Sequence, residues 1–108
     1  MLHICGDNIH FNSMADYPVQ VIHWDTNMPG NPGFDKAVDI IPKAMSGGVS
    51  RKAMAYGTVY EVNNEIKKAL NQSKGNRFLL GPGCSVLVPP SPEEHLWALK
   101  NGSKTFSI

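Results

Sequence analysis

The amino-acid sequence predicts an α/β fold with a parallel sheet, and three observations lead to this prediction. Short runs rich in β-branched and aromatic residues alternate with segments of helical apolar periodicity, and turn residues separate them. Strands that alternate with helices favour a parallel sheet with right-handed crossovers. The 108 residues, 42% of them hydrophobic and 18% charged, are enough for one small domain with its own core, covering residues 1–108.

The first half of the chain supplies two expected strands and two expected helices. The apolar run at 2–5 precedes the turn signal Gly6-Asp7-Asn8, and V-Q-V-I-H-W is typical of a strand. A turn-rich loop at 25–33 follows that strand. In chain order we expect a strand at 2–5, a helix at 9–17, a strand at 19–24 and a helix at 34–41 that ends near Pro42.

The second half contains the clearest helix of the sequence. Gly57-Thr58 opens it, residues 73–76 end it, and its apolar positions share one face at helical spacing: Val59, Val62, Ile66 and Leu70. Ser91 is expected to cap the last helix, with Pro92 in the first helical position. The other expected elements are a strand within 43–49 that ends in Gly47-Gly48, a strand at 77–80, and a last helix that runs to about Lys100 and stops at Asn101-Gly102.

Four strand–loop–helix units fit two architectures, part of a closed barrel or an open doubly wound sheet. The residues after the first strand read G-D-N-I-H-F, which is not the G-x-G-x-x-G fingerprint. This counts against a dinucleotide-binding open sheet. Gly47-Gly48 either lets the backbone approach a ligand closely or forms a tight turn at the strand end, and the turn is the favoured interpretation.

Charge and hydropathy exclude several classes of function. The net charge is +1 with neutral histidines, and no basic block is present, so we expect neither nucleic acid nor an anionic membrane as a partner. The apolar runs are too short to span a bilayer. The first residues lack the basic start and long apolar stretch of a signal peptide, so the expected location is cytoplasmic.

Three residues with metal-binding side chains fall at expected strand ends. His3 and Cys5 share one face of the first strand because side chains alternate along it, and Cys84 follows the fourth strand. Functional residues of parallel α/β folds gather at this edge, and one imidazole with two thiolates suits Zn²⁺ with a position left for substrate. Buried cysteines also serve as small hydrophobic residues, and in a secreted protein the two could form a disulfide, so the residues alone leave these interpretations open.

Four segments resemble motifs of a known family. They are L-H-I-C-G-D-N at 2–8, V-I-H-W-D at 21–25, F-L-L-G-P-G-C at 78–84 and P-P-S-P-E-E-H-L-W-A-L at 89–99. Together they are similar to the uroporphyrinogen decarboxylase family, in its branch of cobalamin-dependent methyltransferases, and the H-x-C…C pattern is specific to that branch. The resemblance covers essentially the whole chain and implies the carboxy-terminal half of a (β/α)8 TIM barrel.

The resemblance also implies a mechanism and a set of site residues. His3, Cys5 and Cys84 would be zinc ligands, with His23 or Asp25 as a displaceable fourth ligand. In that branch the zinc holds a small-molecule thiol such as coenzyme M as thiolate, which attacks a methyl group on a corrinoid carried by a partner protein. Asp7 and Asn8 either orient the ligands or cap the next helix. No catalytic acid or base is identified.

The remaining candidate side chains favour structural roles. His10 and His95 are expected at the surface or in packing, and Trp24 and Trp97 in the core or at an interface. The methionines Met28, Met45 and Met54 show no ligand pattern.

A complete barrel of this type needs about 250 residues, so the resemblance implies that an amino-terminal half is missing. We therefore expect either a homo-oligomer or pairing with that half, because open strand edges and an uncovered apolar face promote association. One alternative function is a non-catalytic half barrel that folds and oligomerises. Another is a tetrapyrrole enzyme or binder of the decarboxylase type, a lyase of porphyrin biosynthesis. The only arginines are Arg51 and Arg77, which counts against decarboxylation, and whether this chain alone is an enzyme stays open.

Overall fold

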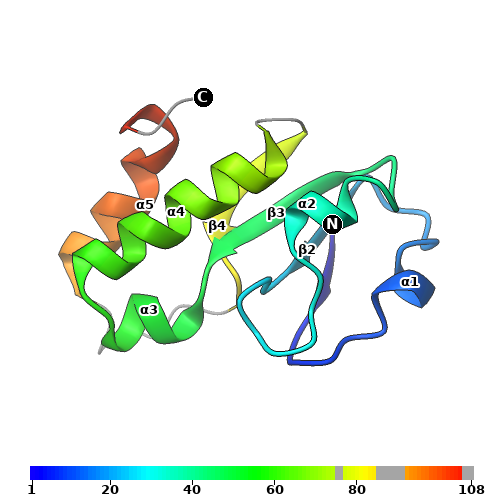
Figure 1. The fold of residues 1–108 in the computed structure, drawn as a ribbon, viewed down its shortest axis with the longest axis horizontal. Helices are drawn as coiled ribbons and strands as arrows, with labels where there is room; N and C mark the ends of the chain where they lie inside the picture. The colour runs from blue at the N-terminus through cyan, green and yellow to red at the C-terminus, as the bar shows by residue number, and fades with distance from the viewer. Residues whose placement is uncertain (75–76, 85–91, 106–108) are drawn as a thin grey trace.

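The computed structural model describes residues 1–74, 77–84 and 92–105, with side chains up to residue 102. Strands and helices alternate along the chain, as expected (Figure 1). The elements are β1 (Leu2–Ile4), α1 (Phe11–Met14), β2 (Val21–Trp24), α2 (Phe34–Ala37), β3 (Ala44–Val49), α3 (Arg51–Tyr56), α4 (Val59–Ser73), β4 (Phe78–Pro82) and α5 (Glu93–Thr105).

The strands form one parallel sheet of four in the order β1-β2-β3-β4. The order follows the chain without the reversal that marks a doubly wound sheet, so of the two predicted architectures the arrangement matches part of a barrel. The register aligns one row of residues across the whole sheet: His3, His23, Ser46 and Leu79. The predicted fold class is confirmed.

Helices cover one face of the sheet, where α2 and α4 cross in front of the strands (Figure 1). A line of four aromatic rings runs through this core, with centroid separations of 4.6 Å, 5.1 Å and 4.8 Å from Phe11 through Trp24 and Phe34 to Phe78. Trp24 and Phe34 are fully buried. Rings at these separations add edge-to-face attraction to the burial of their apolar area. This packing holds β2 against α1 and α2.

Helix α4 confirms the strongest helical prediction. Thr58 caps it and Glu61 completes a capping box, because the Thr58 hydroxyl accepts from the Glu61 amide at 3.1 Å and the Glu61 carboxylate accepts from the Thr58 amide. Val62, Ile66 and Leu70 are buried against α3, β4 and α5. Val59, at the start of the predicted stripe, is instead exposed.

Several predicted boundaries differ from the structure. Helix α1 has four residues instead of the expected nine, and α3 was not expected at all. Ser50 caps α3 by accepting from the Ala53 amide, a local signal that the sequence contains. Strand β4 extends to Pro82. Helix α5 begins at Glu93, one residue later than expected, and the proposed cap Ser91 lies outside the described residues.

Helix α5 also continues through Gly102, where we expected it to stop. Gly102 is buried, and a Cβ atom there would lie 2.9 Å from the Ile66 side chain. This glycine therefore allows α5 to approach α4 closely, and tertiary packing outweighs its weak helical propensity.

The Gly47-Gly48 pair lies inside β3 and does not form the expected strand-end turn. Both residues have positive φ, at 132° and 126°. A Cβ at residue 47 would lie 2.5 Å from the Trp24 carbonyl oxygen, and one at residue 48 would lie 2.9 Å from Ala69 Cβ. Glycine is required here because β3 is pressed between β2 and α4.

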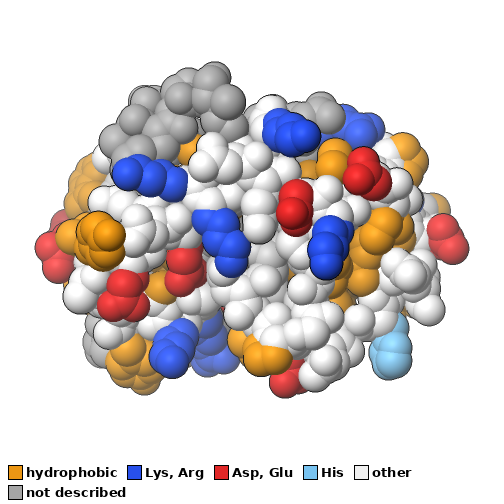
Figure 2. Space-filling model, in the orientation of Figure 1, with side chains coloured by type: hydrophobic (Ala, Val, Ile, Leu, Met, Phe, Trp, Pro, Cys, Tyr) orange, Lys and Arg blue, Asp and Glu red, His pale blue; other side chains and the backbone are white. Residues whose placement is uncertain are grey.

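Charges of both signs are intermixed over the face shown in Figure 2, without a large area of one sign. This distribution agrees with the small net charge of the chain. Among the described residues, no helix combines the length and apolarity that a membrane span requires.

Candidate metal centre

The three predicted ligands converge at the carboxyl edge of the sheet. His3 and Cys5 project from the end of β1 on the face away from the helices, and Cys84 follows β4 by two residues. The two sulfur atoms are 3.2 Å apart, and the Cys84 Sγ lies 3.8 Å from His3 Nε2. One ligand atom from each residue lies within 4.8 Å of the other two. Side chains separated by 79 positions in the sequence thus form one cluster.

Of the separations within this cluster, one matches a tetrahedral metal site and another is shorter. In a tetrahedral site with bonds of about 2.3 Å to sulfur and about 2.0 Å to nitrogen, neighbouring ligand atoms lie roughly 3.5–3.8 Å apart. The Cys84–His3 distance of 3.8 Å matches this value, and the sulfur atoms, at 3.2 Å, need to separate by about half an ångström. Two thiolates and an imidazole are also ligands that Zn²⁺ prefers.

The sulfur pair is a pair of thiols without a disulfide. The hydrogen bond between Cys5 and Cys84 raises the pKa of the Cys5 thiol. The charge of the Cys84 thiolate and burial raise this pKa further. The positive charge of Arg51 partly opposes this change in pKa. Two sulfurs that compete for a proton in this way respond strongly to a cation, because a metal ion stabilises both thiolates at once.

His23 lies beside His3 in the neighbouring strand, with ring centroids 4.7 Å apart. The Nδ1 atoms of the two rings are 2.6 Å apart, and His23 Nε2 lies 2.6 Å from the Pro82 carbonyl oxygen. Both nitrogens of His23 are therefore engaged. Burial lowers the pKa of His23, as does the charge of His3, whereas the bond to Pro82 and the charge of Asp25 act in the opposite direction.

Asp25, the other candidate for a fourth ligand, is 4% exposed. Its carboxylate accepts a hydrogen bond from the Asn27 amide at 2.9 Å. A Cβ at Gly83 would lie 2.6 Å from the Asp25 carboxyl carbon, so Asp25 packs directly beneath the residue that precedes Cys84. Neither His23 nor Asp25 is grouped with the three converging ligands, and the identity of a fourth ligand stays a prediction.

Asp7 and Asn8, proposed to orient the ligands, lie on the exposed loop after β1. The Asn8 amide donates to the Pro29 carbonyl at 2.8 Å, and Asn8 has a positive φ of 45°. This bond joins the β1–α1 loop to the β2–α2 loop. Asn8 thus joins two loops; α1 has His10 at its N-cap and no side-chain cap, so neither Asp7 nor Asn8 caps it, and their orientation of the ligands stays a prediction.

Asn31 is the residue that sequence reasoning missed. Its amide nitrogen donates to the Gly6 and Asp25 carbonyls, both at 2.8 Å, and its oxygen accepts from the Ile9 amide at 3.0 Å. One side chain therefore fixes the loop after Cys5 against the end of β2. In the sequence, Asn31 stands among turn residues, and only its three-dimensional contacts distinguish it.

His10, His95 and Trp24 occupy the structural positions expected of them. His10 is exposed, and His95 is 1% exposed, with Nδ1 2.9 Å from the Met54 carbonyl. Trp24 belongs to the core. Trp97 is 52% exposed and lies beneath the Lys100 ammonium, so it is outside the core, and its expected place at an interface stays a prediction.

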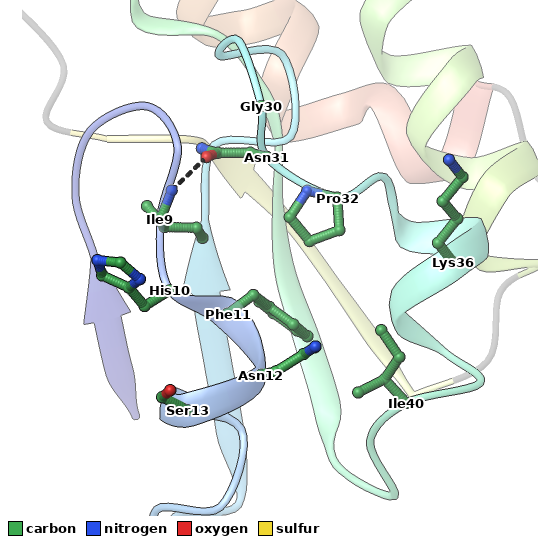
Figure 3. A pocket seen from close by; sticks show the side chains of 10 residues that line it. All are labelled: Ile9, His10, Phe11, Asn12, Ser13, Gly30, Asn31, Pro32, Lys36 and Ile40. Atoms are coloured by element: carbon green, nitrogen blue, oxygen red, sulfur yellow. Dashed lines mark hydrogen bonds between the residues drawn. The ribbon is translucent and has the colours of Figure 1, made fainter.

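A cavity of about 610 Å³ lies between α1 and α2, away from the candidate metal ligands (Figure 3). Asn31 closes one end, where its side chain meets the Ile9 amide. The lining residues include one imidazole, that of His10, but no thiol and no carboxylate, so they do not form a group of metal ligands like the cluster at the sheet edge. The lining residues of the cavity are Ile9, His10, Phe11, Asn12, Ser13, Gly30, Asn31, Pro32, Lys36 and Ile40.

Comparison with known proteins gives a likeness among solved structures. No protein-family model and no curated protein matches the sequence. Among solved structures, the chain is similar to a methyltransferase from Methanosarcina mazei, with a TM-score of 0.81 and 28% sequence identity. The match covers 99% of this chain and 31% of the methyltransferase. The chain therefore has a methyltransferase-like fold and spans less than a third of that protein.

Proposed function

We propose that this chain carries the metal-binding, thiol-activating part of a methyltransferase that moves a methyl group from a corrinoid protein to a thiol such as coenzyme M. The convergence of His3, Cys5 and Cys84 carries the proposal. The likeness to a solved methyltransferase supports the reaction class. The resemblance of four sequence segments to the cobalamin-dependent branch of the uroporphyrinogen decarboxylase family supports the corrinoid and the thiol.

In the proposed site, His3, Cys5 and Cys84 would hold Zn²⁺, to which the acceptor thiol would also bind. Bound zinc supplies one chemical effect, which is to lower the pKa of a coordinated thiol so that it stays a thiolate at neutral pH. His3 and Cys5 are both exposed, so a thiol from solution can reach the cluster. The two protein sulfurs contribute negative charge that keeps the acceptor sulfur nucleophilic.

The first experiment is zinc analysis of protein purified under reducing conditions. We expect about one zinc per chain, lost in Cys84→Ser and in His3→Gln, because a three-ligand site loses most of its affinity with any ligand. His10→Gln is the matched control, since His10 is an exposed histidine outside the cluster. A folded wild-type chain with both thiols reduced and no zinc would contradict the proposal.

Methyl transfer is tested on the zinc-loaded chain with methylcobalamin as donor and coenzyme M as acceptor. Formation of methylated coenzyme M, abolished in Cys84→Ser, is the expected result. Zinc binding without transfer would leave the metal site intact and point to a requirement for residues outside this chain, which matches only 31% of the solved methyltransferase.

The second proposal concerns the face of the sheet that carries the cluster. Leu79 on this face is 53% exposed, and β1 and β4 are the outer strands of the sheet that the described residues form. Exposed apolar groups and unpaired strand edges promote association. We propose that further strands of a barrel complete this face, supplied by another polypeptide segment or a second copy. Light scattering during size-exclusion chromatography tests the second copy, and a stable monomer at low concentration would count against it.

A further inference from the structure

Three hydrogen-bonding contacts connect the backbone of β4 to the proposed metal site through two histidines. The Pro82 carbonyl oxygen lies 2.6 Å from His23 Nε2, and His23 Nδ1 lies 2.6 Å from His3 Nδ1. On the far side of the His3 ring, Nε2 faces the Cys84 sulfur at 3.8 Å. The contacts therefore link β1 and β4, which carry the cluster, through His23 of β2.

The chemistry of these atoms determines where the ring protons lie. A carbonyl oxygen only accepts hydrogen bonds, so His23 Nε2 must carry a hydrogen. A neutral imidazole carries one ring hydrogen, which leaves His23 Nδ1 as an acceptor. His3 Nδ1 must then donate to it. The consequence is that the neutral His3 ring has its unprotonated nitrogen, Nε2, on the side of Cys84.

We propose that His23 is a positioning residue that fixes the tautomer and ring orientation of His3, so that His3 Nε2 presents its lone pair to the metal. The inference rests on the proposed metal site. Histidine ligands generally donate their second ring N–H to a carboxylate, a carbonyl or water. Here a second imidazole accepts that bond and is itself anchored on the Pro82 carbonyl.

The arrangement also gives His23 a function distinct from that of a fourth ligand. Its two nitrogens are directed at His3 and Pro82, so ligation by His23 would break one of these bonds. Such partners of metal ligands typically change metal affinity by about 10–100-fold when removed. Loss of the His23 ring should therefore weaken zinc binding without removing a ligand.

The test compares His23→Gln with His23→Leu. A glutamine amide both donates and accepts, so it can keep a bond to Pro82 and to His3, whereas leucine can make neither. We expect zinc affinity, measured by competition with a chelator, to fall about 10–100-fold in His23→Leu and much less in His23→Gln. Equal affinities in wild type and His23→Leu would overturn the inference. Absence of zinc from the wild type would instead overturn the proposed metal site.

A second measurement needs no metal. Nitrogen-15 NMR of the metal-free protein reports which nitrogen of each histidine is protonated. We expect His3 in the Nδ1–H form and His23 in the Nε2–H form, with the His3 preference lost in His23→Leu. His3 in the Nε2–H form in the wild type would overturn the inference whether or not zinc binds. A purely structural role for His23 would change stability and leave the His3 tautomer unaltered.

Discussion

The two faces of the sheet differ in what their residues do. Along β2, Ile22 and Trp24 point toward the helices and are fully buried, while His23 between them points to the opposite face and bonds to His3. The helix-covered face contains the line of aromatic rings, and the other face carries the thiol–histidine cluster. Because side chains alternate along a strand, adjacent residues belong to the core and to the face that carries the cluster. A substitution can therefore change the stability of the fold without changing the cluster, or the reverse.

The largest expected loss of folding stability follows a substitution on the face that the helices cover. Replacing Trp24 with alanine removes a fully buried ring that contacts both Phe11 and Phe34, and such changes cost about 3–5 kcal/mol. Urea unfolding of the metal-free protein, followed by circular dichroism, measures the loss. Leu79→Ala, on the other face and 53% exposed, is the control and should change the free energy of unfolding by about 0.5 kcal/mol or less. Similar losses in both variants would refute the division between the two faces.

A smaller loss of stability is expected in β3, which packs closely against β2 and α4. Gly47→Ala places a Cβ 2.5 Å from the Trp24 carbonyl oxygen at a φ of 132°, and strain of this kind costs about 1–3 kcal/mol. Gly81→Ala is the matched control, because the nearest atom to its Cβ, Ser46 Oγ, is 4.0 Å away. Thermal unfolding of the two variants should separate them clearly. An unchanged melting temperature in Gly47→Ala would show that β3 can relax.

A substitution in the loops beside the cluster should lower the free energy of unfolding less than the changes above. It should also weaken metal binding. Asn31→Ala removes bonds to Gly6, Ile9 and Asp25, and we expect a loss of about 1–2 kcal/mol together with weaker zinc binding. Asn12→Ala, an exposed asparagine of α1, should have neither effect. Chelator competition and urea unfolding measure the two quantities. Wild-type zinc affinity in a destabilised Asn31→Ala protein would mean that this side chain supports only the fold.

The smallest expected effect is a dependence of stability on pH. Burial lowers the pKa of His23 in the folded protein, whereas in the unfolded chain a histidine titrates near about 6.5. Below that pH the unfolded chain binds the proton more readily than the folded protein does. The contribution of His23 to the free energy of unfolding is therefore complete above that pH and decreases as the pH falls. Urea midpoints of metal-free protein, measured at several pH values, should show this decrease, and His23→Gln should reduce it. An identical pH profile in His23→Gln would assign the dependence to another group.

The position of His3, Cys5 and Cys84 at one edge of the sheet was predictable because it follows from two local rules, whereas their contact requires curvature of the sheet, since β1 and β4 are its outer strands. Alternation along a strand places His3 and Cys5 on one face, and parallel strands bring their carboxyl ends to one edge. The order of the strands was not predictable from the residues alone, since a barrel segment and a doubly wound sheet share the same alternation. The orderly succession β1-β2-β3-β4 resolves that choice.

The supporting contacts around the cluster have no local signature. His23 and Pro82 are 59 positions apart in the sequence, and neither residue type reveals that one donates to the carbonyl of the other. Asn31 resembles the turn residues around it, although its amide joins two loops. Gly102 has a low helical propensity, yet α5 continues through it because the missing side chain allows contact with Ile66.

Periodicity and residue type were therefore sufficient for the α/β class, the capped helix α4 and the set of candidate ligands. These features depend on neighbours within a few positions, where backbone geometry imposes fixed repeats of 2.0 and 3.6 residues. The tautomer of His3, the restraint of the loops by Asn31 and the extent of α5 depend on the distance between remote segments. That distance is set by the packing of the whole core, so these features are visible only once the chain is folded.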